Sequence, residues 1–480
     1  MTVQRVSDLF ALGRTQPTLE FIDVDTHGDT RLFIDPSALK NLDSVWGDEC
    51  VDLLQNFFSA VLAAIRSGAD AQARYLLASL SEPNDTHLGL SRGQAKGSGM
   101  GSGLAREMWD ALRNSQAVTS GLLSDLEDTI LFIDHIGHDR ISDITTNIIR
   151  GPLVEFTQDV CGYYGIPMQS GVAVRVWDSR NGTWRQKFTD LPMTSTGRLL
   201  LVPKEIVRAR GNFDPGSYYQ HYILPYYQDV EYNAGRGMVR ILRNGRRTVV
   251  PPTKKSVQHR YGRGKKVNLD ATLQDPTLLE RYRADAPRRD SILDHTEIAA
   301  KTSGVVPNWD ALLQAVLDVP PGRPDADAYE VAIEKLLTAL FYPALGFPKR
   351  QHRTHQGRKR IDITYTNLAE RGFFAWLHRV QKVACGQIAV ECKNYSKELG
   401  NPELDQLTGR FGVNRGFVGI LCHRGFGDKA LLIERCRDAV SDGRGYVLIL
   451  DDDDLRELVE QRKKGETDFA FLLARFQQII

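Results

Sequence analysis

Apolar residues recur at regular intervals over much of the chain. Residues 50–65 place them every three or four positions, which predicts an amphipathic helix, and residues 145–164 predict a second helix. Residues 21–25 and 31–36 alternate between apolar and polar side chains, which is typical of half-buried strands closed by a turn. An apolar run at 199–202 that ends at a proline predicts a buried strand. The first half of the chain is therefore expected to mix α and β structure.

The last third of the chain carries longer apolar patterns. A broad apolar face over residues 328–341 predicts a helix. Short β-prone runs follow at 361–363, 388–395, 417–422 and 446–450. The pattern therefore predicts one helix followed by several core strands.

Two of these strands carry charged side chains in apolar surroundings. Glu391 and Lys393 are two residues apart, so they share one strand face, whereas Val390 and Cys392 point to the other. Asp362 projects from the preceding strand, between two isoleucines. Unpaired buried charge is costly, and two converging carboxylates are suitable ligands for a hard divalent cation such as Mg²⁺. A lysine beside them can hold or polarise a water molecule, so these residues indicate phosphodiester hydrolysis.

These residues resemble the PD-(D/E)xK nuclease superfamily, which has the restriction-endonuclease-like fold, and within it the Mrr-like branch. Asp362 matches the family's strand aspartate, and Glu391 with Lys393 matches its E-x-K, while Ile361 stands where the family often has proline. The resemblance covers only the final third of the chain. It implies a multidomain protein with a C-terminal α/β domain, a mixed sheet flanked by helices, after an α+β N-terminal domain of unknown type.

The family also carries functional residues on two helices. Its helix glutamate maps best onto Glu330, with Glu334 one turn later as the alternative. Its helix glutamine matches Gln406, which would contact Lys393 or the nucleic-acid backbone. The expected catalytic residues are Glu330, Asp362, Glu391, Lys393 and Gln406.

The resemblance implies a metal-dependent reaction. Asp362, Glu391 and the backbone carbonyl of Cys392 would bind Mg²⁺, or Mn²⁺ in its place, and the metal would lower the pKa of a bound water. Lys393 would orient that water or neutralise the charge that develops on the phosphate. Glu330 would support a second metal or orient metal-bound water. The expected activity is that of an endonuclease acting on DNA, and such modules often belong to restriction or phage-defence systems.

Each feature also has a structural interpretation. An E-x-K occurs by chance in many strands, and Asp362 alone could cap a turn at a strand end. The basic residues 358–360 and the Asn394-Tyr395 pair after Lys393 favour the nuclease. Two other functions stay open: a nuclease effector that is silent until a ligand or partner binds the N-terminal half, and a nucleic-acid-binding protein whose nuclease fold has lost turnover.

A strongly basic stretch, residues 236–266, contains no aspartate or glutamate. Such a stretch is usually a solvated linker, and it can still attract phosphates without choosing a sequence. The residues expected to bind nucleic acid are Arg358, Lys359, Arg360, Lys254, Lys255, Arg260, Arg263, Lys265 and Lys266.

Three further stretches contain candidate ligand groups. The glycine-rich residues 82–103 have no G-x-x-x-x-G-K-[ST] motif, so a flexible surface loop is favoured over a phosphate loop. Histidines and aspartates within 134–143 could ligate a metal or form an ordinary polar turn. The four aspartates at 451–454 lie between a strand and a helix, so capping and the helix dipole explain them.

Length and composition set the wider frame. At 480 residues the chain is long enough for several domains. We expect a mixed α/β sensor or targeting domain at 1–232, a basic linker and helical connector at 233–323, and the nuclease domain at 324–480. The net charge of +1 carries no overall sign of nucleic-acid binding, so that signal must be local.

The cysteines and the apolar runs bear on where the protein acts. Six cysteines without a C-x-x-C spacing indicate reduced thiols in a cytoplasmic protein. The sequence has no signal-like segment and no apolar run of membrane-spanning length. The expected partners are DNA, a second copy of the chain for cutting both strands, and an activating ligand at the N-terminal domain, with no membrane.

Overall fold

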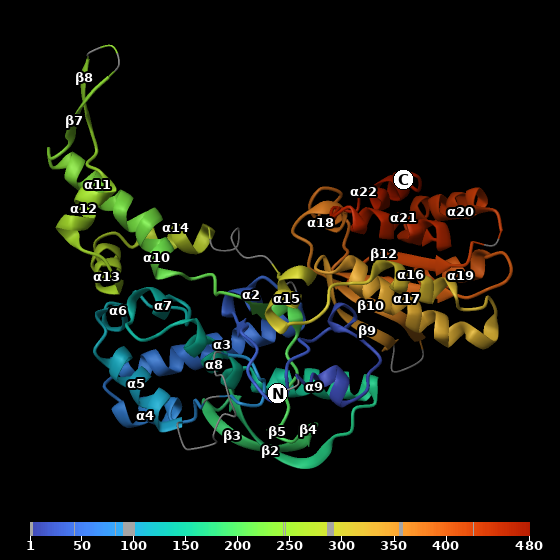
Figure 1. Ribbon diagram of the computed structural model, residues 1–480, viewed down its shortest axis with the longest axis horizontal. Coiled ribbons are helices and arrows are strands. Elements are labelled where there is room, and N and C mark those ends of the chain that lie inside the picture. The colour runs from blue at the N-terminus through green and yellow to red at the C-terminus, as the bar shows by residue number, and fades with distance from the viewer. Residues whose placement is uncertain are drawn as a thin grey trace.

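The computed structural model describes residues 3–42, 44–81, 83–89, 101–242, 244, 246–285, 292–354, 359–425 and 427–480. Figure 1 shows two groups of elements, with the orange and red C-terminal elements beside the blue, cyan and green ones. Buried apolar residues form two large clusters, one in each of these groups. The first core runs from Val6 to Ile298 and includes Tyr342, and the second core runs from Val316 to Ile479.

Helices build most of the first core. They are α1 (Val6–Leu9), α2 (Pro36–Lys40), α3 (Val45–Arg66), α4 (Asp70–Leu77), α5 (Gly101–Arg113), α6 (Gln116–Thr119), α7 (Asp128–Phe132), α8 (His138–Ile148) and α9 (Arg150–Tyr164). Helix α3 confirms the helix predicted at 50–65, and Phe57 on its inner face is buried. Residues 145–164 are helical as predicted except at Ile149, where the single predicted helix is divided into α8 and α9. Pro152 lacks the N–H that would bond to the Ile148 carbonyl, and its ring crowds that carbonyl.

The strands of this part are mostly short and paired two by two. They are β1 (Phe33–Ile34) with β6 (Val207–Arg208), β2 (Gln169–Asp178) with β3 (Thr183–Leu191), and β4 (Met193–Thr194) with β5 (Gly197–Arg198). The strand predicted at 31–36 is thus reduced to β1. Residues 21–25 form isolated bridges at Phe21 and Asp25 rather than a strand. Residues 199–202 are buried but irregular, and the Leu200 N–H donates to the Asp85 carbonyl. Burial alone does not make a strand, because a strand also needs a neighbour in register.

The basic stretch at 236–266 is folded, so the expected linker is wrong. It contains β7 (Met238–Ile241), β8 (Arg247–Val250) and α12 (Lys254–Tyr261), and Figure 1 shows the β7–β8 hairpin extending away from the body. The helices that flank it along the chain are α10 (Pro215–Tyr218), α11 (Leu224–Asn233), α13 (Lys265–Gln274), α14 (Thr277–Asp285) and α15 (His295–Thr302), whereas α16 (Trp309–Leu317) packs in the second core through Val316. Buried residues of this region, such as Val257 and Tyr282, belong to the first core.

A five-stranded mixed sheet organises the second core. Its strand order is β13–β12–β11–β10–β9, from β9 (Leu345–Thr354), β10 (Lys359–Asn367), β11 (Gln387–Lys393), β12 (Val418–His423) and β13 (Tyr446–Leu450). Strands β11, β12 and β13 are parallel, whereas β10 is antiparallel to both of its neighbours. Strands β12 and β13 confirm the core strands predicted at 417–422 and 446–450.

Helices cover both faces of this sheet. They are α17 (Ala326–Phe341), α18 (Gly372–Arg379), α19 (Asn401–Thr408), α20 (Lys429–Ser441), α21 (Asp452–Lys463) and α22 (Ala470–Gln477). Helix α17 confirms the helix predicted at 328–341, and its Thr338 hydroxyl lies 2.9 Å from that of Tyr365. Tyr365 pairs with Ile388, three residues before Glu391, so Tyr365 and Glu391 point to opposite faces. Gln406 of α19 bonds to Glu391, so α17 and α19 lie on opposite faces of the sheet.

The cysteines are free thiols, and five of the six are buried. Among the described residues, no helix is long and apolar enough to cross a membrane.

Candidate active site

The antiparallel pairing of β10 and β11 brings the two predicted strand carboxylates together. Ile363 pairs with Val390, which sets Asp362 and Glu391 side by side on one face of the sheet. Both are buried, and the Cys392 N–H donates to Asp362 Oδ2 at 2.8 Å. The apolar strands thus hold the carboxylates in a fixed relation at the sheet surface.

Helix α19 closes the same face with its glutamine. Lys393 Nζ donates to Glu391 Oε1 at 2.9 Å and to Gln406 Oε1 at 3.2 Å. Gln406 Nε2 in turn donates to Glu391 Oε1 at 2.6 Å. Glu391, Lys393 and Gln406 therefore form a closed hydrogen-bonded set beside Asp362.

The charges in this set depend on each other. Burial raises the pKa of Glu391, and the nearby Asp362 carboxylate raises it further against the opposing effect of Lys393. Burial would lower the pKa of Lys393, but the adjacent Glu391 outweighs it and the pKa of the lysine is raised. Lys393 is thus a cation at neutral pH, suited to donating hydrogen bonds rather than to accepting a proton.

Arg410 approaches the remaining oxygen of Glu391. Its Nε lies 3.5 Å from Glu391 Oε2, and both side chains are buried. Within the described part of the chain, Glu391 Oε2 and the Nε and Nη1 atoms of Arg410 have no hydrogen-bond partner. Arg410 is absent from the expected catalytic residues, because no motif in the sequence links this arginine to the E-x-K.

The donor set fits a hard cation with few protein ligands. Asp362 and Glu391 supply two carboxylates, and Mg²⁺ commonly takes one or two of these with water and phosphate oxygens. Over the described ranges, no group of three or more His, Cys, Asp or Glu side chains is arranged to hold a metal. Burial raises the pKa of the Cys392 thiol far above its usual range, so only its backbone carbonyl is a candidate ligand.

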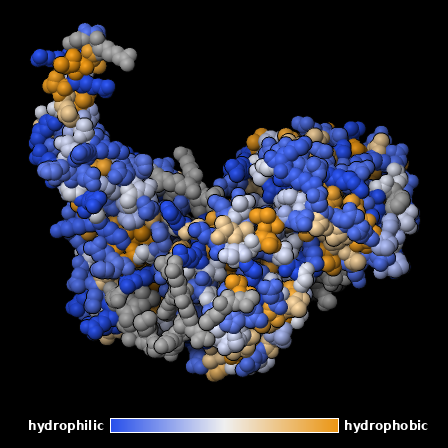
Figure 2. Space-filling model, viewed as in Figure 1, coloured by the Kyte–Doolittle hydropathy of each residue, from blue (hydrophilic) through white to orange (hydrophobic). Residues whose placement is uncertain are grey.

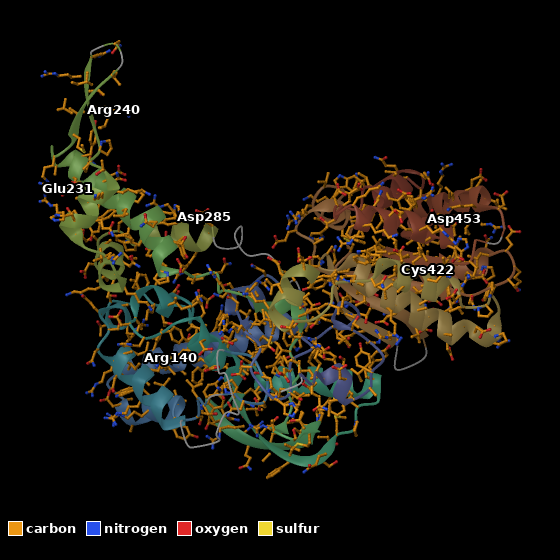
Figure 3. The ribbon with its side chains drawn as sticks, viewed as in Figure 1. Arg140, Glu231, Arg240, Asp285, Cys422 and Asp453 are labelled. Carbon is orange, nitrogen blue, oxygen red and sulfur yellow. The ribbon has the colours of Figure 1, made fainter. Side chains whose placement is uncertain are left out.

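The candidate helix glutamate belongs to the helix on the opposite face of the sheet from Gln406. Glu330 lies on α17, is buried, and lines a cavity of about 700 Å³ between α17 and α9. Glu330, Asp362 and Glu391 all act on the Cys392 thiol, after burial and Cys422, to raise its pKa. Figure 3 labels Cys422, which pairs with Cys392 in the middle of the second core.

The alternative, Glu334, is already engaged. Arg14 of the first core donates to both of its carboxylate oxygens, at 2.6 and 3.1 Å, and Arg350 lies 3.5 Å away. An acid held by two arginines is a poor ligand for a further cation, which favours Glu330. Sequence reasoning missed Arg14, which lies far from α17 in the chain and carries no motif.

The predicted nucleic-acid-binding residues fall into two separate groups. Arg358 lies outside the described residues, and the backbones of Lys359 and Arg360 belong to β10. The other group lies on and around α12 and α13, at the far end of the molecule from the second core (Figure 1). The structure therefore does not join the two groups into one surface.

Several cations of the second group have protein partners. Lys254 donates to the Gln220 carbonyl, Arg260 lies 3.1 Å from Glu231, and Lys265 donates to two backbone carbonyls near the end of α7. Lys255, Arg263 and Lys266 are exposed.

The remaining candidate stretches behave as structural elements where they are described. Asp451 caps α21 by accepting hydrogen bonds from the N–H groups of Asp453 and Asp454, which confirms the capping interpretation of residues 451–454. Histidines of 134–143 belong to no metal-binding group in the described ranges. Much of the glycine-rich stretch 82–103, at 90–100, lies outside the described residues.

Comparison with known proteins bears on the first core alone. Residues 11–213 match the model of a family described as Domain of unknown function (DUF8370). No curated protein and no solved structure matches the chain. The candidate active site, on β10, β11 and α19, lies outside the matched segment.

Proposed function

We propose that the second core is a Mg²⁺-dependent endonuclease domain of the restriction-endonuclease-like class that hydrolyses phosphodiester bonds of DNA. The observation that carries the proposal is the closed set of Glu391, Lys393 and Gln406 next to Asp362. An E-x-K that is merely structural has no need of a glutamine from a separate helix and a second carboxylate from a separate strand. The mixed sheet with helices on both faces is consistent with the same class.

Each residue has a task that follows from its surroundings. Asp362 and Glu391 would bind Mg²⁺ or Mn²⁺, which when bound activates water and withdraws charge from the phosphate. The Cys392 N–H holds Asp362, and Gln406 holds Glu391, so neither carboxylate has to be ordered at the moment of reaction. Lys393, which is protonated, would donate to the attacking water or to a phosphate oxygen.

The test is cleavage of supercoiled plasmid, linear duplex and single-stranded DNA with Mg²⁺ or Mn²⁺. Asp362→Asn and Lys393→Ala should each lower the rate at least about 100-fold, because the first removes a charged metal ligand and the second removes the cation beside the reacting phosphate. Asp453→Asn makes the same chemical change at an exposed site of the same core and should leave the rate unaltered. Metal-dependent cutting that survives both active-site substitutions would exclude this site.

A gated nuclease is the second candidate, favoured by the Arg14–Glu334 pair. The first core holds α17, the helix that carries Glu330, through a buried ion pair beside a cavity of about 700 Å³. A ligand or partner that disturbs this contact could therefore change the position of Glu330. In this case the full chain does not cut, and Arg14→Gln initiates metal-dependent cutting that Asp362→Asn abolishes again. An Arg14→Gln chain that stays silent while retaining its fold would contradict gating through this contact.

A role in restriction or phage defence rests on the resemblance to the nuclease superfamily. Plaque counts on bacteria that express the wild-type chain or Asp362→Asn test it directly. If both chains protect the bacteria from phage equally, the protection does not depend on nuclease activity.

A further inference from the structure

The β7–β8 hairpin exposes apolar side chains on both of its faces. Val239 pairs with Val249 and Arg240 with Thr248, so successive pairs point to alternate faces. Val239, Ile241 and Val249 are 63%, 65% and 54% exposed, and Met238 on the opposite face is 45% exposed. Figure 2 shows these apolar atoms in orange on a narrow projection at the upper left. Isolated two-stranded hairpins are marginally stable, and exposed apolar clusters commonly mark a binding surface.

The root of the hairpin is firmly attached to the first core. Tyr261 of α12 stacks on Tyr227 of α11 with ring centroids 4.0 Å apart. The buried Glu231 carboxylate accepts hydrogen bonds from Arg236 at 2.6 and 2.9 Å and from the Tyr261 hydroxyl at 2.5 Å. Figure 3 labels Glu231 at this root and Arg240 on the hairpin above it. The hairpin is thus a projection on a fixed base.

Charge on the hairpin has a single sign. From Asn233 to Leu269 the chain has no aspartate or glutamate, and the nearest acid, Glu231, is neutralised by Arg236 and Arg260. Across the described part of the hairpin, Arg240, Arg246 and Arg247 are exposed and have no ion-pair partner. Such a surface attracts a polyanion.

The combination of positive charge and two apolar faces fits some binding partners better than others. An element that lies on an anionic membrane has one apolar face and places its charges on the other. A second copy of the hairpin would bring like charges together. A groove of a nucleic-acid duplex meets both faces of a two-stranded ribbon, with phosphates for the arginines and base edges and sugars for the apolar side chains.

We propose that the β7–β8 hairpin is an arm that inserts into a groove of duplex DNA and holds it for the second core. The identity of the nucleic acid as DNA rests on the proposed function. The arm and the second core project from the same side of the molecule, with an open hollow between them in Figure 2. Binding by the arm is independent of sequence at the phosphates and is separate from the chemistry at Asp362.

Duplex binding by the full chain in EDTA, followed by fluorescence anisotropy of a labelled duplex over a range of salt, tests the arm without cleavage. Arg240→Gln with Arg247→Gln should weaken binding about tenfold near 0.1 M salt and lower the slope of log Kd against log salt by about two. Ile241→Ser should weaken binding with no change in slope, since an apolar contact releases no counterions. Arg180→Gln with Lys187→Gln removes the same charge from the β2–β3 hairpin and is the matched control.

Several outcomes would contradict the proposal that the hairpin binds duplex DNA. One is an arginine double variant whose affinity and salt slope equal those of the β2–β3 control. Another is wild-type binding to anionic phosphatidylserine vesicles, but not to the duplex, that the arm substitutions abolish. A third is a dimer in sedimentation that becomes a monomer on arm substitution while DNA affinity is unchanged.

Failure of the arm and failure of the nuclease are distinguishable. If the wild-type chain cuts DNA and the arm variants bind the duplex as tightly as the wild type, the nuclease proposal stands and the arm proposal fails. A chain that binds duplex through the arm, but never cuts with any metal, keeps the arm and loses the nuclease.

Discussion

Lys393 retains its proton because of its acidic neighbours, chiefly Glu391. Burial alone would lower the pKa of this lysine, yet the Glu391 carboxylate at 2.9 Å raises it. The E-x-K spacing already predicted that the two side chains share a strand face. Whether the lysine is protonated depends on its burial and on its distance from Glu391, and the spacing of the two residues in the sequence specifies neither.

His295 shows the opposite balance and leads to a prediction about pH. It is buried against Tyr342 and donates from Nε2 to the Ala339 carbonyl at 2.8 Å, and burial lowers its pKa to about 3. The native state then binds fewer protons than the unfolded state below pH 6.5, so stability is full above that pH and is lost as the pH falls toward 3. This residue should contribute a loss of about 1.4 kcal/mol per pH unit.

Urea unfolding at several pH values measures this effect. His295→Gln keeps a donor for Ala339 but cannot ionise, so its free energy of unfolding should fall less steeply below pH 6.5 than that of the wild type. His259→Gln, at an exposed position, is the control and should follow the wild type. Equal slopes for wild type and His295→Gln would contradict the prediction.

At the scale of elements, apolar periodicity was reliable where a helix or strand stands on its own pattern. Helices α3 and α17 and strands β12 and β13 confirm their predictions. The failures have specific causes: Pro152 divides one helix, and residues 199–202 are buried without a strand partner. The linker prediction for the basic stretch was wrong because the charge of a segment indicates whether it meets water and not whether it folds.

The acidic start of α21 allows a test of capping against metal binding. Asp451→Ala should lower the stability of the second core by about 1–2 kcal/mol, because it removes the hydrogen bonds to two helix N–H groups. It also releases Lys429, which donates to Asp451 at 2.6 Å. Thermal unfolding measures the loss, and Mg²⁺ titration calorimetry should be identical for the wild type and for the variant. Asp453→Ala, at an exposed position, is the control, and a fall in metal affinity for either variant would favour a metal site there.

At the scale of the whole molecule, the two cores meet through α17. Arg14 from the first core pairs with Glu334 in a contact from which water is nearly excluded, and side-chain exposures are 4% and 1%. Arg14 also stacks over Tyr164, which bonds to the buried Glu20. The candidate catalytic helix is thus part of the boundary between the cores.

Replacing one residue of the Arg14–Glu334 pair should lower the free energy of unfolding more than replacing both. Among the described residues, Arg14→Met leaves the buried Glu334 carboxylate with Arg350 at 3.5 Å as its remaining ion-pair partner, and should reduce the free energy of unfolding by about 3 kcal/mol. Arg14→Met with Glu334→Met should lose less than either single variant, because no uncompensated charge remains. A double-mutant cycle in urea measures the coupling, and additive single losses would contradict it.

The sequence by itself determined the local features: where α3, α17, β12 and β13 form, that Glu391 and Lys393 share one strand face, and that Asp451 opens a helix. These follow from periods of 2 and 3.6 residues and from capping chemistry, which depend on near neighbours in the chain. The tertiary structure alone decided that Gln406 closes on Glu391, that Arg14 binds Glu334, and that the basic stretch becomes a projecting hairpin. Those outcomes join residues that are distant in the chain, and their burial and charge state exist only once the two cores have packed.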